Sequence, residues 1–162
     1  MRTTIAAVLL VLLLAACGAH DAEYDMMRSI ASGDIDRERI ISAEELRQIL
    51  YNHFGRVQIR FGDSLYILPE NGKVAQLGGA GHCEPGFDNV IRPDGWDCDD
   101  YAIAALVPLR NYAFGAMFVT TASGQRHALN VFVNYNREVV YWEPQTCRYY
   151  QGRFYKPELI LF

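Results

Sequence analysis

The sequence predicts an α+β fold, and three observations lead to this prediction. A helix-like stretch with a capping signal comes early, a second helix begins in the middle of the chain, and the last third consists of strand-like runs. Helical and strand-like segments that are grouped rather than alternating are typical of α+β domains. The 162 residues, of which 51% are hydrophobic and 21% charged, suffice for one domain with a packed core.

The first predicted helix runs from about Ala43 to Phe54. Ser42 and Glu45 have the spacing of a capping box, and Gly55 supplies a stop signal. Apolar residues recur on one face of this helix, at Leu46, Ile49, Leu50 and Phe54. We therefore expect the helix to pack on the core through that face.

The remaining elements follow from alternation and from the positions of glycine and proline. A second helix is expected from about Cys98 towards Asn111, with Pro108 kinking or shortening its end. The segment from Gly72 to Gly95 is rich in Gly, Pro and Asn and is expected to be a loop. Strands are expected at 57–61, 65–69, 116–121, 127–134, 138–143 and 158–162, with a hairpin turn at 134–138.

The first 16 residues are predicted to be a signal peptide. A basic Arg2 precedes the apolar run Ile5–Ala16, which is too short to cross a bilayer as a helix. A leader with a short helical and acidic segment is expected at 17–40, and the folded domain at 41–162.

The end of the signal peptide predicts a lipid anchor. Leu14-Ala15-Ala16-Cys17 resembles the lipobox of bacterial lipoproteins, in which the cysteine is lipidated and becomes the new N-terminus. Gly18 after the cysteine resembles lipoproteins destined for the outer membrane. Ordinary cleavage after Ala19 is the alternative. We expect an envelope protein that is lipid-anchored on the periplasmic face of the outer membrane.

Export places the domain where disulfides persist. Without Cys17, three cysteines remain, Cys83, Cys98 and Cys147, so one of them is left over as a thiol. The sequence allows three pairings. If Cys98 is the free thiol, a Cys83–Cys147 bridge closes a long loop, which is worth about 4–5 kcal/mol on the loop-entropy estimate.

Cys98 lies in "WDCDDYA" at the predicted start of a helix, and it has candidate partners for nucleophilic chemistry. A cysteine nucleophile needs a base and a group that orients the base. His127 opens one predicted strand and Glu143 ends the next, so the hairpin between them brings the two side chains together. The order Cys, His, acid is that of papain-like and transglutaminase-like folds. The alternative is that Cys98 is a small buried hydrophobe.

These motifs resemble a known family. "WDCDDYA", "HALN" and "EPQT", in this order, are similar to the papain-like cysteine-protease domain at the C-terminus of the MOA-type fungal agglutinin and its bacterial and phage relatives. The resemblance extends to "ISAEELRQIL" and to "GDSLYILP", where Asp63 and Tyr66 match the pattern, and it covers roughly residues 40 to 162. It implies that Cys98 is the nucleophile, His127 the base and Glu143 the orienting acid.

The resemblance also implies calcium as a cofactor. In the family the acidic residues after the cysteine bind the metal, and Ca²⁺ takes six to eight oxygen ligands, some of which Asp99 and Asp100 can supply. A bound dication would favour the thiolate, whereas bare carboxylates oppose it. The alternative is that these are first-turn acids that complement the helix dipole, with Asp97 as the N-cap.

A second, weaker calcium motif begins at Asp34. The stretch "DIDRERIISAEE" places acids at the first, third, fifth and twelfth positions of an EF-hand-like loop, namely Asp34, Asp36, Glu38 and Glu45. Arg39 stands at the sixth position, where an EF-hand has Gly. The alternative is an acidic linker followed by the capping box.

These interpretations predict a calcium-assisted cysteine peptidase, a hydrolase that cleaves peptide or isopeptide bonds in a peptide or protein substrate. The alternative function is a non-catalytic envelope lipoprotein that uses the same fold to bind a partner or peptide. A net charge of −4, a pI near 5.5 and no Lys/Arg cluster argue against nucleic acid. The sugar-binding trefoil of the agglutinin has no counterpart here, so galactose binding is not expected.

Overall fold

The structure is a computed structural model that describes residues 28–29, 32, 36–78, 97–121, 123–150 and 156–162. The predicted signal peptide, the lipidation site Cys17, the acid Asp34 and Cys83 lie outside these residues. No helix in the described ranges is long and apolar enough to cross a membrane.

A six-stranded sheet forms the centre of the fold, with the strand order β2-β8-β4-β5-β6-β7. β2 pairs with β8 in parallel, and every other pair in this sheet is antiparallel. A second sheet has only two strands, β1 and β3. The strands are β1 Ile40–Ser42, β2 Gln58–Arg60, β3 Leu65–Ile67, β4 Phe114–Thr120, β5 Arg126–Val133, β6 Val139–Glu143, β7 Arg148–Tyr150 and β8 Lys156–Leu161.

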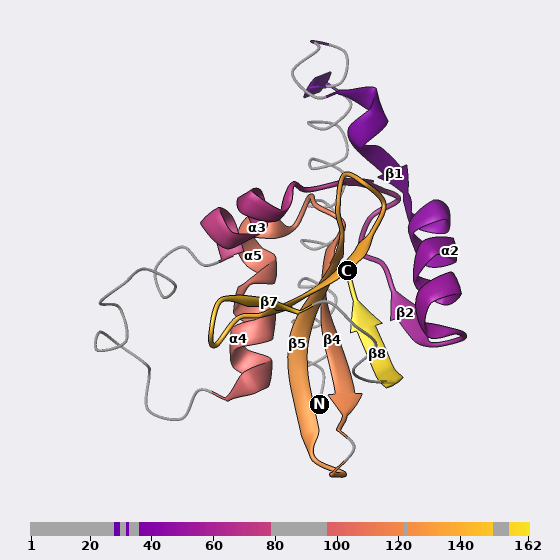
Figure 1. Cartoon of the computed structure of the whole chain (residues 1–162). Helices are drawn as coiled ribbons and strands as arrows, with labels where there is room; N and C mark the ends of the chain where they lie inside the picture. The colour runs from indigo at the N-terminus through magenta and orange to yellow at the C-terminus, as the bar shows by residue number, and fades with distance from the viewer. Residues whose placement is uncertain (1–27, 30–31, 33–35, 79–96, 122, 151–155) are drawn as a thin grey trace, which may run out of the picture.

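The helices are short and lie on both sides of the large sheet (Figure 1). They are η1 Arg37–Arg39, α2 Ala43–Phe54, α3 Asn71–Gly78, α4 Cys98–Ala104 and α5 Leu106–Leu109. The alternation of side chains along β4 and β5 divides the core between the two faces. Met117, Leu129 and Val131 pack with α2, whereas Ala116, Ala128 and Phe132 pack with α4 or α5 and α3.

Several predicted elements are confirmed. α2 has the predicted bounds, and Ser42 and Glu45 form its capping box. The strand pair β5–β6 and its turn also match the prediction. The second predicted helix is divided into α4 and α5 at Ala105. α3 falls in a segment that was expected to be loop, and the rest of that segment, 79–96, lies outside the described residues.

The predicted α+β class, a papain-like or transglutaminase-like fold with the nucleophile helix packed on an antiparallel sheet, is wrong. More of the described residues lie in strands than in helices, and the large sheet is mixed rather than antiparallel. The sequence pattern marks where a strand lies but not which strand it pairs with, so it missed the parallel β2–β8 pair. β1 and β7, of three residues each, were not among the predicted strands.

Candidate functional site

Cys98 is the first residue of α4, and the structure holds it as a free, half-buried thiol. Small side chains let this helix approach the sheet closely, because Ala102 packs against Ala116 and Ala128. Cys147, by contrast, is disulfide-bonded. Cys83, its expected partner, lies outside the described residues.

The Cys98 sulfur meets the edge of β5. The backbone N–H of Ala128 donates a hydrogen bond to Cys98 Sγ over 3.3 Å. This N–H is available because β6 accompanies β5 only from Asn130 to Val133, so the strand partner on that side has already ended at Ala128. A fixed N–H donor therefore points at the atom on which a thiolate would carry its negative charge.

His127 and Glu143 lie next to this contact and bind each other. His127 Nε2 is 2.7 Å from Glu143 Oε2, and the second carboxylate oxygen accepts a hydrogen bond from the N–H of Gln145 over 3.3 Å. The His127 side chain is 24% exposed and the Glu143 side chain 10%. An ionised carboxylate only accepts hydrogen bonds, so Nε2 carries the proton and Nδ1 of a neutral ring is the acceptor.

The register of the β5–β6 pair explains why these two side chains meet. The last registered pair at this end joins Asn130 to Trp142. One step further, Glu143 stands opposite Leu129, and His127 is the diagonal neighbour on the same face. Pro144 follows Glu143 directly and cannot donate to a ladder, which ends β6 beside the imidazole.

Asn130 is a positioning residue to which the sequence analysis gave no role. Its fully buried side-chain amide donates hydrogen bonds to Ala102 O over 2.9 Å and to Gly115 O over 3.3 Å. It thereby ties α4, and with it Cys98, to the centre of the sheet. The signal in the sequence was a polar residue within the apolar run "HALNVFV", where an unpartnered amide would be costly.

The aspartates beside Cys98 lie in the exposed first turn of α4. Asp100 Oδ2 accepts a hydrogen bond from the N–H of Asp97 over 3.1 Å. A hydrogen bond between the side chains of Asp97 and Asp99 lowers the pKa of Asp97 and raises the pKa of Asp99. Among the described residues, no three His, Cys, Asp or Glu side chains come together to hold a metal. These aspartates alone do not fit a calcium cage.

Two of the described acids of the EF-hand-like stretch, Asp36 and Glu45, take part in helix caps. Asp36 accepts a hydrogen bond from the N–H of Glu38 over 3.0 Å at the start of η1. Glu45 accepts a hydrogen bond from the N–H of Ser42 over 3.1 Å, and this bond lowers the pKa of Glu45. The first acid, Asp34, lies outside the described residues. Calcium binding by this stretch stays a prediction.

Comparison with known proteins identifies structural relatives but no family. The sequence matches no described protein family, and no curated protein is significantly similar to it. Solved structures that share its fold include a PSL1a–E64 complex, with a TM-score of 0.63 and 23% identity. They also include the Polyporus squamosus lectin bound to the human-type influenza-binding epitope Neu5Acα2-6Galβ1-4GlcNAc, with a TM-score of 0.61 and 22% identity. In both, the match covers 76% of this chain and 50% of the other.

At this level of identity the likeness establishes the fold alone, and the chain spans half the length of each structure. Membership of the agglutinin-type protease family, which the motifs suggested, stays a prediction. The comparison does overturn the functional expectations. The relative that is named by its activity is a lectin bound to a glycan, so the predicted cysteine peptidase activity and hydrolase class are corrected.

The expected partners change with the function. The named ligand of the lectin is a glycan rather than a peptide, and it contains galactose, so the expectation that galactose binding is absent has no support. The non-catalytic alternative relied on the same predicted papain-like fold, which the observed sheet does not support. Cysteine, histidine and acid at these spacings predict an arrangement of side chains, but the ligand depends on the surface around them.

Proposed function

We propose that Cys98 is a reactive thiol that forms a covalent bond with an electrophilic carbon, with His127 as its proton acceptor and Glu143 as the group that orients the imidazole. The observation that carries this proposal is the contact between Cys98 Sγ and the N–H of Ala128, 3.3 Å long, directly beside the His127–Glu143 pair. The proposal ends at the covalent adduct and includes no hydrolysis.

The open edge of β5 makes the arrangement chemically useful. Alternation directs the His127 side chain and the Ala128 side chain to opposite faces of the strand. The thiol reaches the strand at its edge, where β6 has ended, and proton transfer requires the imidazole to turn towards the sulfur across that edge. Both Cys98 and His127 are partly exposed, which leaves room for a ligand to approach.

With an epoxide as the electrophile, the thiol opens the three-membered ring. The thiol proton moves to His127 Nδ1, and the imidazolium is stabilised by the Glu143 carboxylate. The sulfur attacks a ring carbon, the C–S bond forms and the C–O bond of the epoxide breaks. The oxygen released from the ring takes the proton back from the imidazolium as a hydroxyl group. No oxidant or reductant takes part.

The test is labelling of the mature protein, with its disulfide intact, by an epoxysuccinyl probe such as E64. We expect one adduct, located at Cys98 by mass spectrometry, which forms faster in the folded protein than in the same protein unfolded in urea. Cys98→Ala should abolish the adduct, and Gln125→Ala, an exposed change in the β4–β5 turn, should leave its rate unchanged. A rate no greater than that of the unfolded chain would refute the proposal.

We further propose that Cys17 carries a lipid that tethers the protein to the bacterial envelope. The support is the apolar run Ile5–Ala16, whose last residues Leu14-Ala15-Ala16 precede Cys17 directly. Expressed in a Gram-negative host, the wild-type protein should partition with outer membranes and have a lipidated N-terminal cysteine. Cys17→Ser should abolish the modification, and a wild-type protein cleaved after Ala19 without lipid would contradict this proposal.

A further inference from the structure

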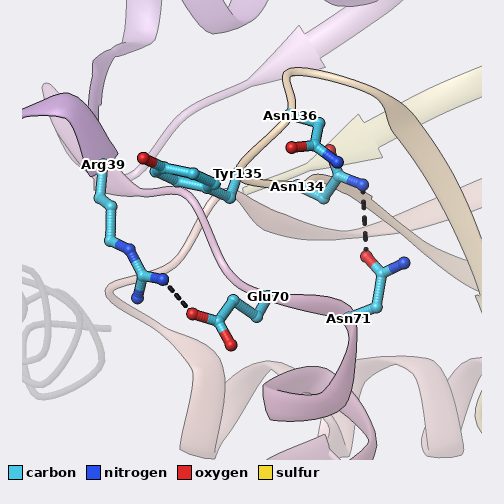
Figure 2. A pocket seen from close by; sticks show the side chains of 6 residues that line it. All are labelled: Arg39, Glu70, Asn71, Asn134, Tyr135 and Asn136. Atoms are coloured by element: carbon cyan, nitrogen blue, oxygen red, sulfur yellow. Dashed lines mark hydrogen bonds and ion pairs between the residues drawn. The ribbon is translucent and has the colours of Figure 1, made fainter.

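A polar pocket of about 360 Å³ lies where η1, the start of α3 and the β5–β6 turn meet (Figure 2). Its volume falls in the range of small-molecule sites. The lining consists entirely of polar, charged or tyrosine side chains, from Arg39, Glu70, Asn71, Asn134, Tyr135 and Asn136. The pocket lies at the opposite end of β5 from Cys98 and does not belong to the thiol site.

Hydrogen bonds fix the wall of this pocket before any ligand arrives. The N–H of Tyr135 donates to Pro69 O over 3.0 Å, which joins the turn to the segment in front of α3. The Asn134 side chain, in a residue only 4% exposed, donates to Asn71 Oδ1 over 3.3 Å and to Glu138 Oε2 over 3.0 Å. Its own Oδ1 accepts from the N–H of Glu138 over 2.9 Å. A preformed wall lowers the ordering cost of binding.

The charges in the pocket cancel. Arg39 and Glu70 form an ion pair, and this hydrogen-bonded partner raises the pKa of Arg39. The Arg39 guanidinium also lies over the Tyr135 ring, 4.9 Å from its centroid. An anionic ligand would face the Glu70 carboxylate, and a cationic ligand would face the Arg39 guanidinium. The lining therefore favours a ligand without net charge.

The groups that remain for a ligand both donate and accept hydrogen bonds. The Asn136 side-chain amide is exposed and has no hydrogen-bond partner among the described residues, and it presents one acceptor and two donor hydrogens. The Glu70 side chain is 62% exposed, and Tyr135 is 39% exposed. Sugar hydroxyls also donate and accept at once, and the C–H face of a pyranose packs on an aromatic ring.

We propose that this pocket binds a neutral pyranose residue at the end of a glycan. The proposal rests on the mixed donors and acceptors, the cancelled charge and the part-exposed tyrosine, and it is independent of the reactive thiol. The ligand class that fits is a hexose or N-acetylhexosamine.

The experiment is ligand-observed NMR with the mature protein and four sugars, glucose, galactose, N-acetylglucosamine and the acidic N-acetylneuraminic acid. At least one neutral sugar should bind saturably, with a Kd of about millimolar, as expected for a single ring on a shallow site. Binding of the acidic sugar alone, or of none of the four, would overturn the proposal.

Substitutions test whether the sugar binds in this pocket. Tyr135→Ala and Asn136→Ala should each weaken sugar binding by about tenfold, while Gln125→Ala, in the turn at the far end of the sheet, should not. Thermal unfolding of each variant shows whether the fold is intact, and both pocket changes are on exposed turn residues. Sugar binding that survives the combined Tyr135→Ala and Asn136→Ala variant refutes the assignment to this pocket. Cys98→Ala should bind sugar like the wild type, so failure of one proposal is distinguishable from failure of the other.

Discussion

The two ends of β5 differ in how their polar groups are hydrogen-bonded. At Ala128 the neighbouring strand β6 has ended, so a backbone N–H is left for the Cys98 sulfur. At Asn134 the chain turns straight into β6, and the backbone and side-chain groups of this residue are taken up within the turn. The ends are about 20 Å apart along the strand. Because β6 is shorter than β5, one end of β5 leaves a backbone N–H for the thiol. The hydrogen bonds of the turn hold the other end of β5 rigid. We call these the open end and the closed end.

The largest expected effect comes from removing the proton acceptor at the open end. His127→Ala should slow labelling of Cys98 by about a hundredfold at neutral pH, because a positioned base contributes at least this much to proton transfer. The measurement is the rate of epoxide labelling followed by intact mass. Binding of sugars at the closed end should not change. Labelling of the His127→Ala variant at the wild-type rate would contradict the proposed role of His127 as the proton acceptor.

Asn134→Ala tests the closed end. The buried amide makes three hydrogen bonds that hold the turn, so its loss should lower the free energy of unfolding by about 1–3 kcal/mol. Urea unfolding followed by tryptophan fluorescence measures this change. The rate of Cys98 labelling in the folded variant should equal that of the wild type. A large fall in that rate would mean that the two ends are coupled through β5.

Glu143→Gln tests how much the negative charge of Glu143 contributes at the open end of β5. Glutamine keeps an acceptor for His127 Nε2 but removes the charge, and a hydrogen bond to a charged group is worth about 1 kcal/mol more than a neutral one. We expect labelling of Cys98 to slow by about tenfold, well short of the effect of His127→Ala. Glu138→Gln, in the closed turn, is the matched control and should leave the rate unaltered. An effect of Glu143→Gln equal to that of His127→Ala would indicate loss of imidazole placement rather than of charge.

The smallest effect should come from the exposed aspartates. The combined Asp99→Asn and Asp100→Asn variant should speed labelling of Cys98 a few-fold at low salt, because two exposed negative charges near the sulfur repel the anionic epoxysuccinyl probe and salt screens them. The rates are compared at low and high ionic strength. Millimolar Ca²⁺ should speed the wild type and not the variant if these carboxylates bind the metal. An equal calcium effect on both proteins would contradict the predicted metal site.

The sequence by itself determined the local elements. α2 followed from the Ser42–Glu45 capping box and Gly55, since these groups interact within a few residues of one another. The hairpin β5–β6 followed from alternation and a polar turn, and that hairpin is what brings His127 to Glu143. His127 and Glu143 lie on two strands that a single turn connects, so their contact could be predicted from the sequence.

The tertiary structure decided how these elements combine. The contact of Cys98 with the N–H of Ala128 depends on how closely α4 packs on the sheet, which no local pattern encodes. The parallel pairing of β2 with β8, and the pocket that joins Arg39 to Tyr135, unite segments about a hundred residues apart. Such pairings are selected by the summed packing of the whole core, in which each contact contributes little, so no short motif specifies them.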